Sequence, residues 1–471
     1  MRLRIVQNWA WLLLVLAPVP LSVIPAAAQD IGLPGSLPQE IGKKLSDHIP
    51  EKPTLPPAFS IPVRPLGYSA PGLFYLGRHN SLASLDFIDE NRLLFTFQVP
   101  GLMQREGENA VGSDERQVRA VVVTLPEGKV EAEASWTLHD RARYLWMLKD
   151  GHFLLRDGNG IQEGDASLQL KPSLHFPGRL LWLELTPAQK FMTVNYVTPQ
   201  PKVAQADDPP LARTGITGPG QKPDSKPDPP ELKPDLIVRT LNRDTGEVVT
   251  ESKMGLAVPQ STSSDGYTEV EAGMFSGLLQ HAQMSINAEG FIEAPGADTN
   301  SWILNLKSFD GKARFLDRVN SACRPTSEFV SEHEFLMTAC DVFSGWDVVA
   351  ISTAGNRMWG YQLTKHEIWP QLVNSLDGSR IARETVVVEH PVTDGRPHTI
   401  DSKNFNGQIV RVFNAANGKI ALETTASPIF DGGGNVAISP SGRRVAVLNN
   451  GQIEVFDLPA APPAPNSRSR K

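Results

Sequence analysis

The residues with the most potential for metal or acid–base chemistry lie in one short stretch. His390, His398 and Asp401 fall within His390-Pro-Val-Thr-Asp-Gly-Arg-Pro-His-Thr-Ile-Asp401. Two imidazoles and a carboxylate would suit zinc binding or general-base catalysis if the three side chains converged. The prolines and the glycine between them instead predict an exposed loop, in which histidines are commonly solvated. We name the three residues as metal candidates but expect no resident metal.

Motifs of the common enzyme classes are missing or incomplete. His333-Glu334 and His366-Glu367 each begin like the zinc-protease motif, but neither is followed by the second histidine at the required spacing. The chain has no G-x-S-x-G elbow, no P-loop and no G-x-G-x-x-G after a strand. Asp431-Gly-Gly-Gly-Asn435 could cradle a ligand with its amides, although a flexible loop explains the glycines more simply. The sequence therefore predicts no catalytic residue and no cofactor, and leaves enzymatic activity open.

The only two cysteines of the chain are Cys323 and Cys340. Residues between them predict a hairpin that turns near Glu332-His333 and would bring the cysteine-bearing strands close together. In an oxidising compartment such a pair can form a disulfide. Two buried thiols that behave as small apolar side chains are the alternative.

Aromatic side chains are the best candidates for partner binding. Trp346, Trp359, Tyr361 and Trp369 lie close together in sequence. Tryptophan at a partner surface offers a large apolar face with a polar edge. Packing between neighbouring sheets is the alternative for the same residues.

The first 28 residues have the features of an export signal. Arg2 and Arg4 form a basic start, an apolar segment broken by prolines follows, and Ala26-Ala-Ala28 matches a cleavage site. We therefore expect a secreted or periplasmic protein. No later apolar stretch is long enough to span a membrane, so the cleaved chain should not be membrane-spanning.

The charge of the chain argues against nucleic acid as a partner. The formal net charge is −7, and it becomes −9 when Arg2 and Arg4 leave with the export signal. A mildly acidic chain does not provide the basic surface that phosphate backbones require.

The rest of the chain repeats one unit of short strands and tight turns. The clearest copy spans residues 434–458, where three strands are joined by turns at Pro440-Ser-Gly442 and Asn450-Gly451. Fainter copies occur upstream, and equivalent positions in the six visible units are Phe87, Met147, Leu185, Phe329, Val373 and Ile438. The long interval between Leu185 and Phe329 requires a hidden unit, with an outer hairpin at 302–316 and a degenerate inner pair within about 267–294. Units of ~40 to 50 residues with four strands are typical of a propeller. The sequence thus predicts an all-β fold, a single seven-bladed β-propeller.

The last unit ends after three strands, so its fourth strand must come from elsewhere. Phe59-Ser-Ile-Pro-Val63 and Gly72-Leu-Phe-Tyr-Leu-Gly77 are the two candidates. Either segment would close the ring through an N-terminal strand and cover an edge that otherwise promotes aggregation.

Composition sets the predicted domain boundaries. We expect a signal peptide at 1–28, a disordered tether at 29–57, the propeller at 58–458 and a disordered tail at 459–471. A Pro-rich segment at 200–234 interrupts the third unit and predicts a disordered insertion.

The last unit resembles a WD40-type repeat. Ala437-Ile-Ser-Pro-Ser-Gly-Arg-Arg-Val-Ala-Val447 is followed by Ile453-Glu-Val-Phe-Asp457, although Ser441 stands where Asp is usual and Phe456 where Trp is usual. The resemblance covers one unit as motif and implies a ring that presents its faces and central channel to a partner.

Three functional interpretations follow from this organisation. The first is a non-enzymatic, monomeric binding or scaffold module whose partner is an envelope or secreted protein or peptide. The second is an enzyme of the glycan-active or lyase type that uses the central mouth of the ring. The third places partner binding on the 200–234 insertion.

Overall fold

The computed structural model describes eleven segments, all within the compact unit Leu37–Lys471. They are residues 53–71, 81–99, 104–105, 114–139, 143–198, 235–255, 285–298, 300–322, 324–341, 345–391 and 402–462. Within these segments, no helix is long and apolar enough to cross a membrane.

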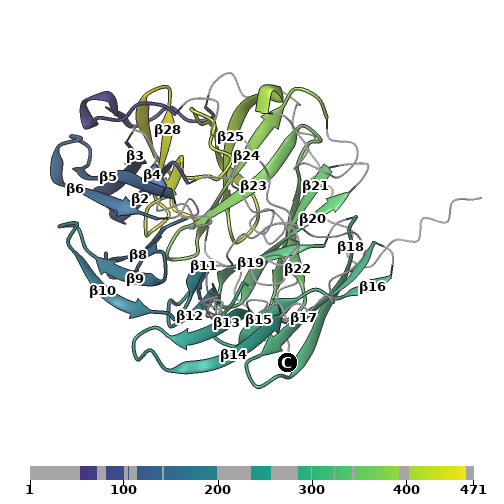
Figure 1. The fold of residues 1–471 in the computed structure, drawn as a ribbon. Coiled ribbons are helices and arrows are strands. Elements are labelled where there is room, and N and C mark those ends of the chain that lie inside the picture. The colour runs from purple at the N-terminus through teal and green to yellow at the C-terminus, as the bar shows by residue number, and fades with distance from the viewer. Residues whose placement is uncertain are drawn as a thin grey trace, which may run out of the picture. The chain divides into compact units, whose positions relative to one another are not determined.

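The described strands form seven antiparallel sheets, which are the blades of a seven-bladed β-propeller (Figure 1). This confirms the predicted fold. In a propeller, the first strand of each blade borders the central axis and the fourth lies outermost.

The first three blades each follow this order. Blade 1 contains β2 (Ala83–Asp89), β3 (Arg92–Gln98), β5 (Asp114–Thr124) and β6 (Val130–Leu138), with the two-residue β4 (Gln104–Arg105) paired to β5. Blade 2 contains β7 (Leu145–Met147), β8 (Phe153–Asp157), β9 (Gly160–Gly164) and β10 (Leu170–His175). Blade 3 contains β11 (Arg179–Leu185), β12 (Phe191–Val197), β13 (Asp235–Asn242) and β14 (Val248–Gly255).

Blade 4 is the degenerate unit that the sequence concealed. Its second strand is interrupted, as β15 (Gly290–Glu293) and β16 (Gly296–Asp298), and both halves pair with β17 (Ser301–Ser308). The outer hairpin β17–β18 (Ala313–Asn320) lies where the sequence predicted it. Among the described residues, which begin here at Ser285, the inner strand is represented by a single bridge between Ile286 and Phe291.

The last three blades are regular. Blade 5 contains β19 (Thr326–Ser331), β20 (Glu334–Asp341), β21 (Gly345–Ser352) and β22 (Arg357–Gln362). Blade 6 contains β23 (Glu367–Asn374), β24 (Arg380–Val388), β25 (Phe405–Asn414) and β26 (Ile420–Thr425). Blade 7 contains β27 (Val436–Ile438), β28 (Arg444–Asn449), β29 (Gln452–Asp457) and, as its fourth strand, β1 (Phe59–Pro62). Within the part of the chain that the structure describes, there are also two three-residue 3-10 turns, η2 (Arg64–Leu66) and η6 (Ser402–Asn404).

The ring is closed by the N-terminal strand, as predicted. β1 runs antiparallel to β29, with Phe59 opposite Val455 and Ile61 opposite Ile453. Of the two predicted candidates, the segment 59–63 therefore supplies the strand, while 72–77 lies outside the described residues. Ile61 is buried in a cluster that joins the two ends of the chain, together with Leu85 and Phe87 of blade 1 and Ile453 and Val455 of blade 7.

The predicted turn chemistry of the last blade is confirmed. Asn450 and Gly451 have φ values of 49° and 76°, the pair of positive angles that a type I′ hairpin needs. This turn places β28 and β29 in direct register, with Asn449 opposite Gln452.

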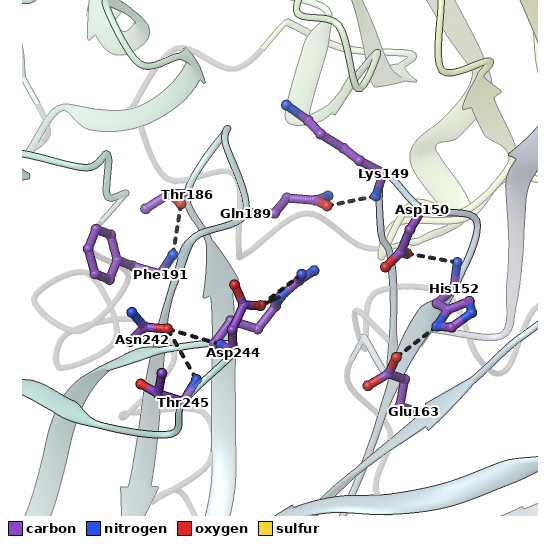
Figure 2. Close-up of polar contacts among 11 residues, drawn as sticks. Lys149, Asp150, His152, Glu163, Thr186, Gln189, Phe191, Asn242, Asp244 and Thr245 are labelled. Atoms are coloured by element: carbon purple, nitrogen blue, oxygen red, sulfur yellow. Dashed lines mark hydrogen bonds and ion pairs between the residues drawn. The ribbon is translucent and has the colours of Figure 1, made fainter.

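Turns between the first and second strands connect neighbouring blades. The backbone N–H of Ser441 in blade 7 donates to Glu90 Oε1 in blade 1 (2.8 Å). In the same way, Lys149 N–H in blade 2 donates to Gln189 Oε1 in blade 3 (2.7 Å; Figure 2), and Gln189 Nε2 donates back to Met147 O (2.9 Å). These bonds fix the innermost strands relative to one another.

Glu332 makes the same kind of connection across the degenerate blade. Its Oε1 accepts from Ala188 N–H in blade 3 (2.7 Å), and its Oε2 accepts from Ala288 N–H in blade 4 (2.6 Å). A single carboxylate from blade 5 thus holds turns of two preceding blades.

Parts of the predicted linker segments can be placed. Thr54, within the expected tether, accepts at its Oγ1 from Glu423 N–H of β26 (2.8 Å), and Leu55 packs beside blades 6 and 7. The insertion 200–234 falls between β12 and β13, which pair directly within blade 3. Residues 200–234 and the tail from 463 lie outside the described residues, so their disorder stays a prediction.

Truncation of one β1 side chain should measure the contribution of ring closure. Ile61→Ala removes a buried side chain from the cluster that joins blades 1 and 7, and should lower the free energy of unfolding by about 2–5 kcal/mol. Ser60→Ala, at an exposed position of the same strand, should change it by no more than about 0.5 kcal/mol. Urea denaturation of both variants checks this, and equal effects would contradict a role for β1 in closure.

Candidate functional site at the propeller axis

Three carboxyl side chains occupy equivalent positions on innermost strands. Asp86 lies on β2 of blade 1, Glu184 on β11 of blade 3 and Glu328 on β19 of blade 5. Asp86 and Glu328 share the same register, each one residue before a Phe and a β-bulge. All three side chains are half-buried, so solvent reaches them although they lie on the strands that border the axis.

Two arginines lie within charge range of these carboxyls. Arg143, just before β7, attracts Asp86, Glu184 and Glu328. Its Nε donates to Leu145 O (3.1 Å), and its guanidinium lies over the Trp146 ring, 5.1 Å from the centroid.

Arg383 of β24 approaches from blade 6. It is 5% exposed, donates from Nη2 to Thr338 Oγ1 (2.6 Å), and lies within charge range of Glu328. We call Asp86, Arg143, Glu184, Glu328 and Arg383 the axial cluster.

The surroundings of the axial cluster disfavour charge on its carboxyls. Burial raises the pKa of Asp86 to about 7, against the opposing effects of a hydrogen bond from Ser84 Oγ (2.5 Å) and the charge of Arg143. Burial likewise raises the pKa of Glu184 to about 7, although Arg143 and a hydrogen bond from Trp182 oppose the change.

Of the three carboxyls, Glu328 has the highest pKa. Burial, together with repulsion from Glu184, raises its pKa to about 8, while Arg383 and Arg143 oppose this. Burial also lowers the pKa of Arg383 to about 10, and the charges of Glu328 and Glu367 counteract the effect. With pKa values raised to about 7, about 7 and about 8, Asp86, Glu184 and Glu328 are each partly protonated near neutral pH.

This arrangement has two chemical uses. A positive group placed among the carboxyls would stabilise their charged forms and displace protons. Alternatively, carboxyls with pKa values near neutrality can serve as general acid and base. Among the described residues, no group of three or more His, Cys, Asp or Glu side chains could hold a metal ion.

A second group of ionisable side chains lies buried in blade 6, and its members bond directly to one another. Arg411 contacts Glu367 Oε2 through Nη1 and donates from Nε to Glu423 Oε2 (2.6 Å). Thr385 Oγ1 adds a bond to Glu367 Oε2 (2.8 Å). Because each of these charges has a direct hydrogen-bonding partner, the network can exist without a ligand.

Two of the predicted partner-binding aromatics are in the core instead. Trp359 is 2% exposed, stacks on Phe413 of blade 6 and donates from Nε1 to Ala415 O (2.6 Å). Tyr361 is 7% exposed and packs edge-on against the same Phe413. Partner binding by Trp359 and Tyr361 is therefore corrected to packing between blades 5 and 6, because neither ring is accessible. The side chains of Trp346 and Trp369 lie outside the described residues.

The metal and disulfide candidates are only partly placed. His390 is exposed after β24, whereas His398 and Asp401 lie outside the described residues. His366, from one of the incomplete zinc-protease motifs, bonds through Nδ1 to Val388 O (3.0 Å). Cys340 is buried and disulfide-bonded. Its predicted partner Cys323 is not among the described residues, so the pairing stays a prediction.

The sequence patterns did not identify the axial cluster, although its three carboxyls recur at one position of the repeat. Asp86, Glu184 and Glu328 each directly precede one of the positions Phe87, Leu185 and Phe329 that mark equivalent points of the repeat. An acidic residue recurring at one point inside otherwise apolar strands marks a site that faces something other than the core.

No protein-family model matches the chain, and neither does any curated protein. Among solved structures, the chain is similar to acylaminoacyl peptidase from Pyrococcus horikoshii (10% identity, TM-score 0.41), with 81% of this chain and 52% of the peptidase covered. It therefore spans about half the length of that peptidase. It is also similar to the β-propeller domain of the Trilobed protease from Pyrococcus furiosus (10% identity, TM-score 0.38, 81% and 99% covered) and to TolB from Acinetobacter baumannii (14% identity, TM-score 0.31, 74% and 73% covered). Such identities concern the fold and not the activity.

The raised pKa values predict that stability falls as pH increases. Glu328 binds its proton more tightly in the folded state, with a pKa of about 8 against an ordinary 4.5. The folded state is therefore favoured at low pH and loses this advantage as pH rises towards 8. We expect the free energy of unfolding, measured in urea between pH 5 and pH 8.5, to decrease with pH, and Glu328→Gln to flatten the decrease. Glu127→Gln, at an exposed turn position, should leave the profile unchanged, and a wild-type profile that rises with pH would contradict the assignment.

Proposed function

We propose that this protein is an exported, non-enzymatic binding or scaffold propeller of the cell envelope, whose axial cluster receives a basic group of a partner polypeptide. The observation that carries the proposal is that Arg143 lies within charge range of Asp86, Glu184 and Glu328, which belong to three different blades. The pattern of residues 1–28 supports export.

The axial cluster has more acidic than basic groups. Three carboxyls face two guanidiniums, and one of these, Arg383, already donates to Thr338. Burial raises the pKa values of all three carboxyls in spite of Arg143, so an added positive charge would stabilise their ionised forms. A lysine or arginine side chain from a partner would supply the missing charge in surroundings where ion pairs are stronger than in water.

Long-range electrostatics favour the same kind of partner. Without residues 1–28 the chain loses two arginines, so its formal net charge falls from −7 to −9, which would attract a basic polypeptide and repel an acidic one. The rigid strands that carry the carboxyls would fix the position of the bound group at little entropic cost.

Titration with a defined basic peptide tests the proposal. We expect acetyl-Gly-Arg-Gly-amide to bind, its citrulline counterpart to bind at least about tenfold more weakly, and affinity to increase from pH 6 to pH 8.5 as the carboxyls ionise. Glu184→Gln and Glu328→Gln should each weaken binding about tenfold or more, whereas Glu127→Gln should not. Isothermal titration calorimetry in two buffers of different ionisation enthalpy measures both affinity and proton release. Equal binding of the two peptides, or no loss in the variants, would refute axial recognition of a basic group.

Deletion of the insertion separates this proposal from binding through residues 200–234. Because β12 and β13 pair directly, a short loop can join them without disturbing the blade. Under the axial proposal the deletion variant keeps both its melting temperature and its peptide affinity. Loss of a partner captured from the envelope fraction, with peptide affinity intact, would move that interaction to the insertion.

The enzymatic alternative is favoured by one specific observation. Glu184 and Glu328 repel each other, and their pKa values are raised to about 7 and about 8, so one can be protonated while the other is ionised. Such a pair is suited to the general acid–base chemistry of a glycan-active or lyase enzyme. Turnover of a polysaccharide panel by the wild type, abolished in Glu328→Gln, would replace the non-enzymatic proposal.

A further inference from the structure

Two carboxyls of the axial cluster point from their own blade towards the next one. Asp86 lies opposite Leu94, which belongs to the apolar cluster between blades 1 and 2. Glu328 lies opposite Leu336, which belongs to the apolar cluster between blades 5 and 6. Residues directly opposite each other in an antiparallel pair project from the same face of the sheet. Asp86 therefore faces blade 2, and Glu328 faces blade 6.

The third carboxyl, Glu184, faces blade 4 in the same way. Its neighbours Leu183 and Leu185 pack against blade 2 in one apolar cluster. Because successive side chains of a strand point to opposite faces of the sheet, Glu184 points away from blade 2. Trp182, two residues earlier and also half-buried, donates a hydrogen bond to the Glu184 carboxyl. A carboxyl and an indole thus lie together on the face of blade 3 that is turned to blade 4.

For Asp86 and Glu328, the next blade supplies an arginine. Arg143, just before the first strand of blade 2, lies within charge range of Asp86. Arg383, on the second strand of blade 6, faces blade 5, because it donates to Thr338 Oγ1 of that blade (2.6 Å). It lies within charge range of Glu328. At both boundaries, a carboxyl of one blade is therefore balanced by a guanidinium of the following blade.

Blade 4 offers Glu184 no such group. The chain has no lysine or arginine between Lys253, on the outermost strand of blade 3, and Lys307, on the third strand of blade 4. Lys307 already has an acidic partner, since its Nζ lies 3.8 Å from Glu293 Oε1. Of the three axial carboxyls, Glu184 is the one that faces a blade without a base for it.

A glutamate occupies the position in blade 4 that is equivalent to Arg383. Arg383 lies two residues after Ile381, the first residue of its strand that pairs with the innermost strand. Glu293 lies two residues after Phe291, which forms the described bridge to the innermost strand of blade 4. Because Ile292 packs towards blade 5, its neighbour Glu293 faces blade 3. A carboxyl therefore lies where blade 6 has a guanidinium.

We propose that an arginine side chain of the partner binds between blades 3 and 4 and pairs with Glu184. This arginine site deepens the proposed function, on which it rests, by giving the basic group a position and a chemical class. A planar guanidinium can form paired hydrogen bonds to a carboxylate and can stack on an indole such as that of Trp182. The guanidinium of Arg143 makes the second kind of contact within the protein, 5.1 Å from the centroid of the Trp146 ring. A lysine ammonium is a strongly hydrated point charge without a planar face.

Isothermal titration calorimetry of three carboxyl variants tests the position and the chemical class. We expect acetyl-Gly-Arg-Gly-amide to bind the wild type at least about fivefold more tightly than acetyl-Gly-Lys-Gly-amide. Glu184→Gln should weaken binding of the arginine peptide about a hundredfold, because it removes the carboxyl that pairs with the bound guanidinium. Asp86→Asn and Glu328→Gln remove carboxyls that already have an arginine of the next blade within range, and should weaken it only about tenfold.

A variant that adds the missing charge tests the same position from within the protein. Glu293→Arg places a guanidinium in blade 4 where blade 6 has Arg383. It should weaken binding of the arginine peptide at least about tenfold, because the side chain of the protein takes the place of the ligand. The control Glu127→Arg changes the charge equally at an exposed turn position and should leave the affinity unchanged.

The results distinguish failure of this site from failure of the proposed function. Equal losses of affinity in the Asp86, Glu184 and Glu328 variants would keep axial recognition of a basic group but overturn its position between blades 3 and 4. An unchanged affinity in folded Glu293→Arg would overturn the position as well, and equal binding of the two peptides would overturn the choice of arginine. No binding of either peptide by the wild type would refute the proposed function itself. If Glu293→Arg does not fold, the order of the three carboxyl variants still decides.

Discussion

The pairing of β1 with β29 is the constraint on which the rest of the propeller depends. Blade 7 has only three strands of its own at the C-terminal end of the chain, and β1 supplies the fourth. The same strand inserts Ile61 into the cluster that joins blade 1 to blade 7. A closed ring fixes the distance from each blade to the axis, and turn contacts such as those of Glu332 fix neighbouring innermost strands. In the closed ring, Arg143 lies within charge range of Asp86, Glu184 and Glu328, and Arg383 lies within charge range of Glu328.

Two groups of ionisable side chains in this molecule have different surroundings. In blade 6, Arg411 is bonded directly to Glu367 and Glu423, so opposite charges compensate each other locally. In the axial cluster, Arg143 acts on three carboxyls at longer range, and their pKa values stay raised. A charged side chain can be buried where an oppositely charged partner bonds to it directly. Where such partners are too few, burial raises the pKa of a carboxyl instead. The incomplete group is therefore the better candidate for function.

Much of the fold could be predicted from the sequence, because each blade carries local signals. Alternating strands and glycine turns located six blades directly, and the turn at Asn450-Gly451 has the expected angles. The long interval between Leu185 and Phe329 predicted blade 4, although the described residues show only one bridge of its inner strand. The site could not be predicted in the same way. Trp359 is attractive as a binding residue in sequence, but its burial depends on Phe413, which lies far along the chain. Likewise, the acidity of Glu328 depends first on its burial in the assembled ring, and then on Glu184 and on two arginines from other blades.

The position of β1 also determines the order in which the protein can assemble. Phe59 and its partner Val455 are separated by 396 positions in the sequence, so the closing contact has one of the highest loop-closure costs available to this chain. During synthesis, residues 59–62 emerge early and must wait for residues 452–457 before they can pair. Until then, one edge of blade 7 and one apolar face of blade 1 remain uncovered, which makes the nearly complete chain the species most exposed to association with other chains. The last step of folding and the greatest risk of aggregation are therefore located at the same contact.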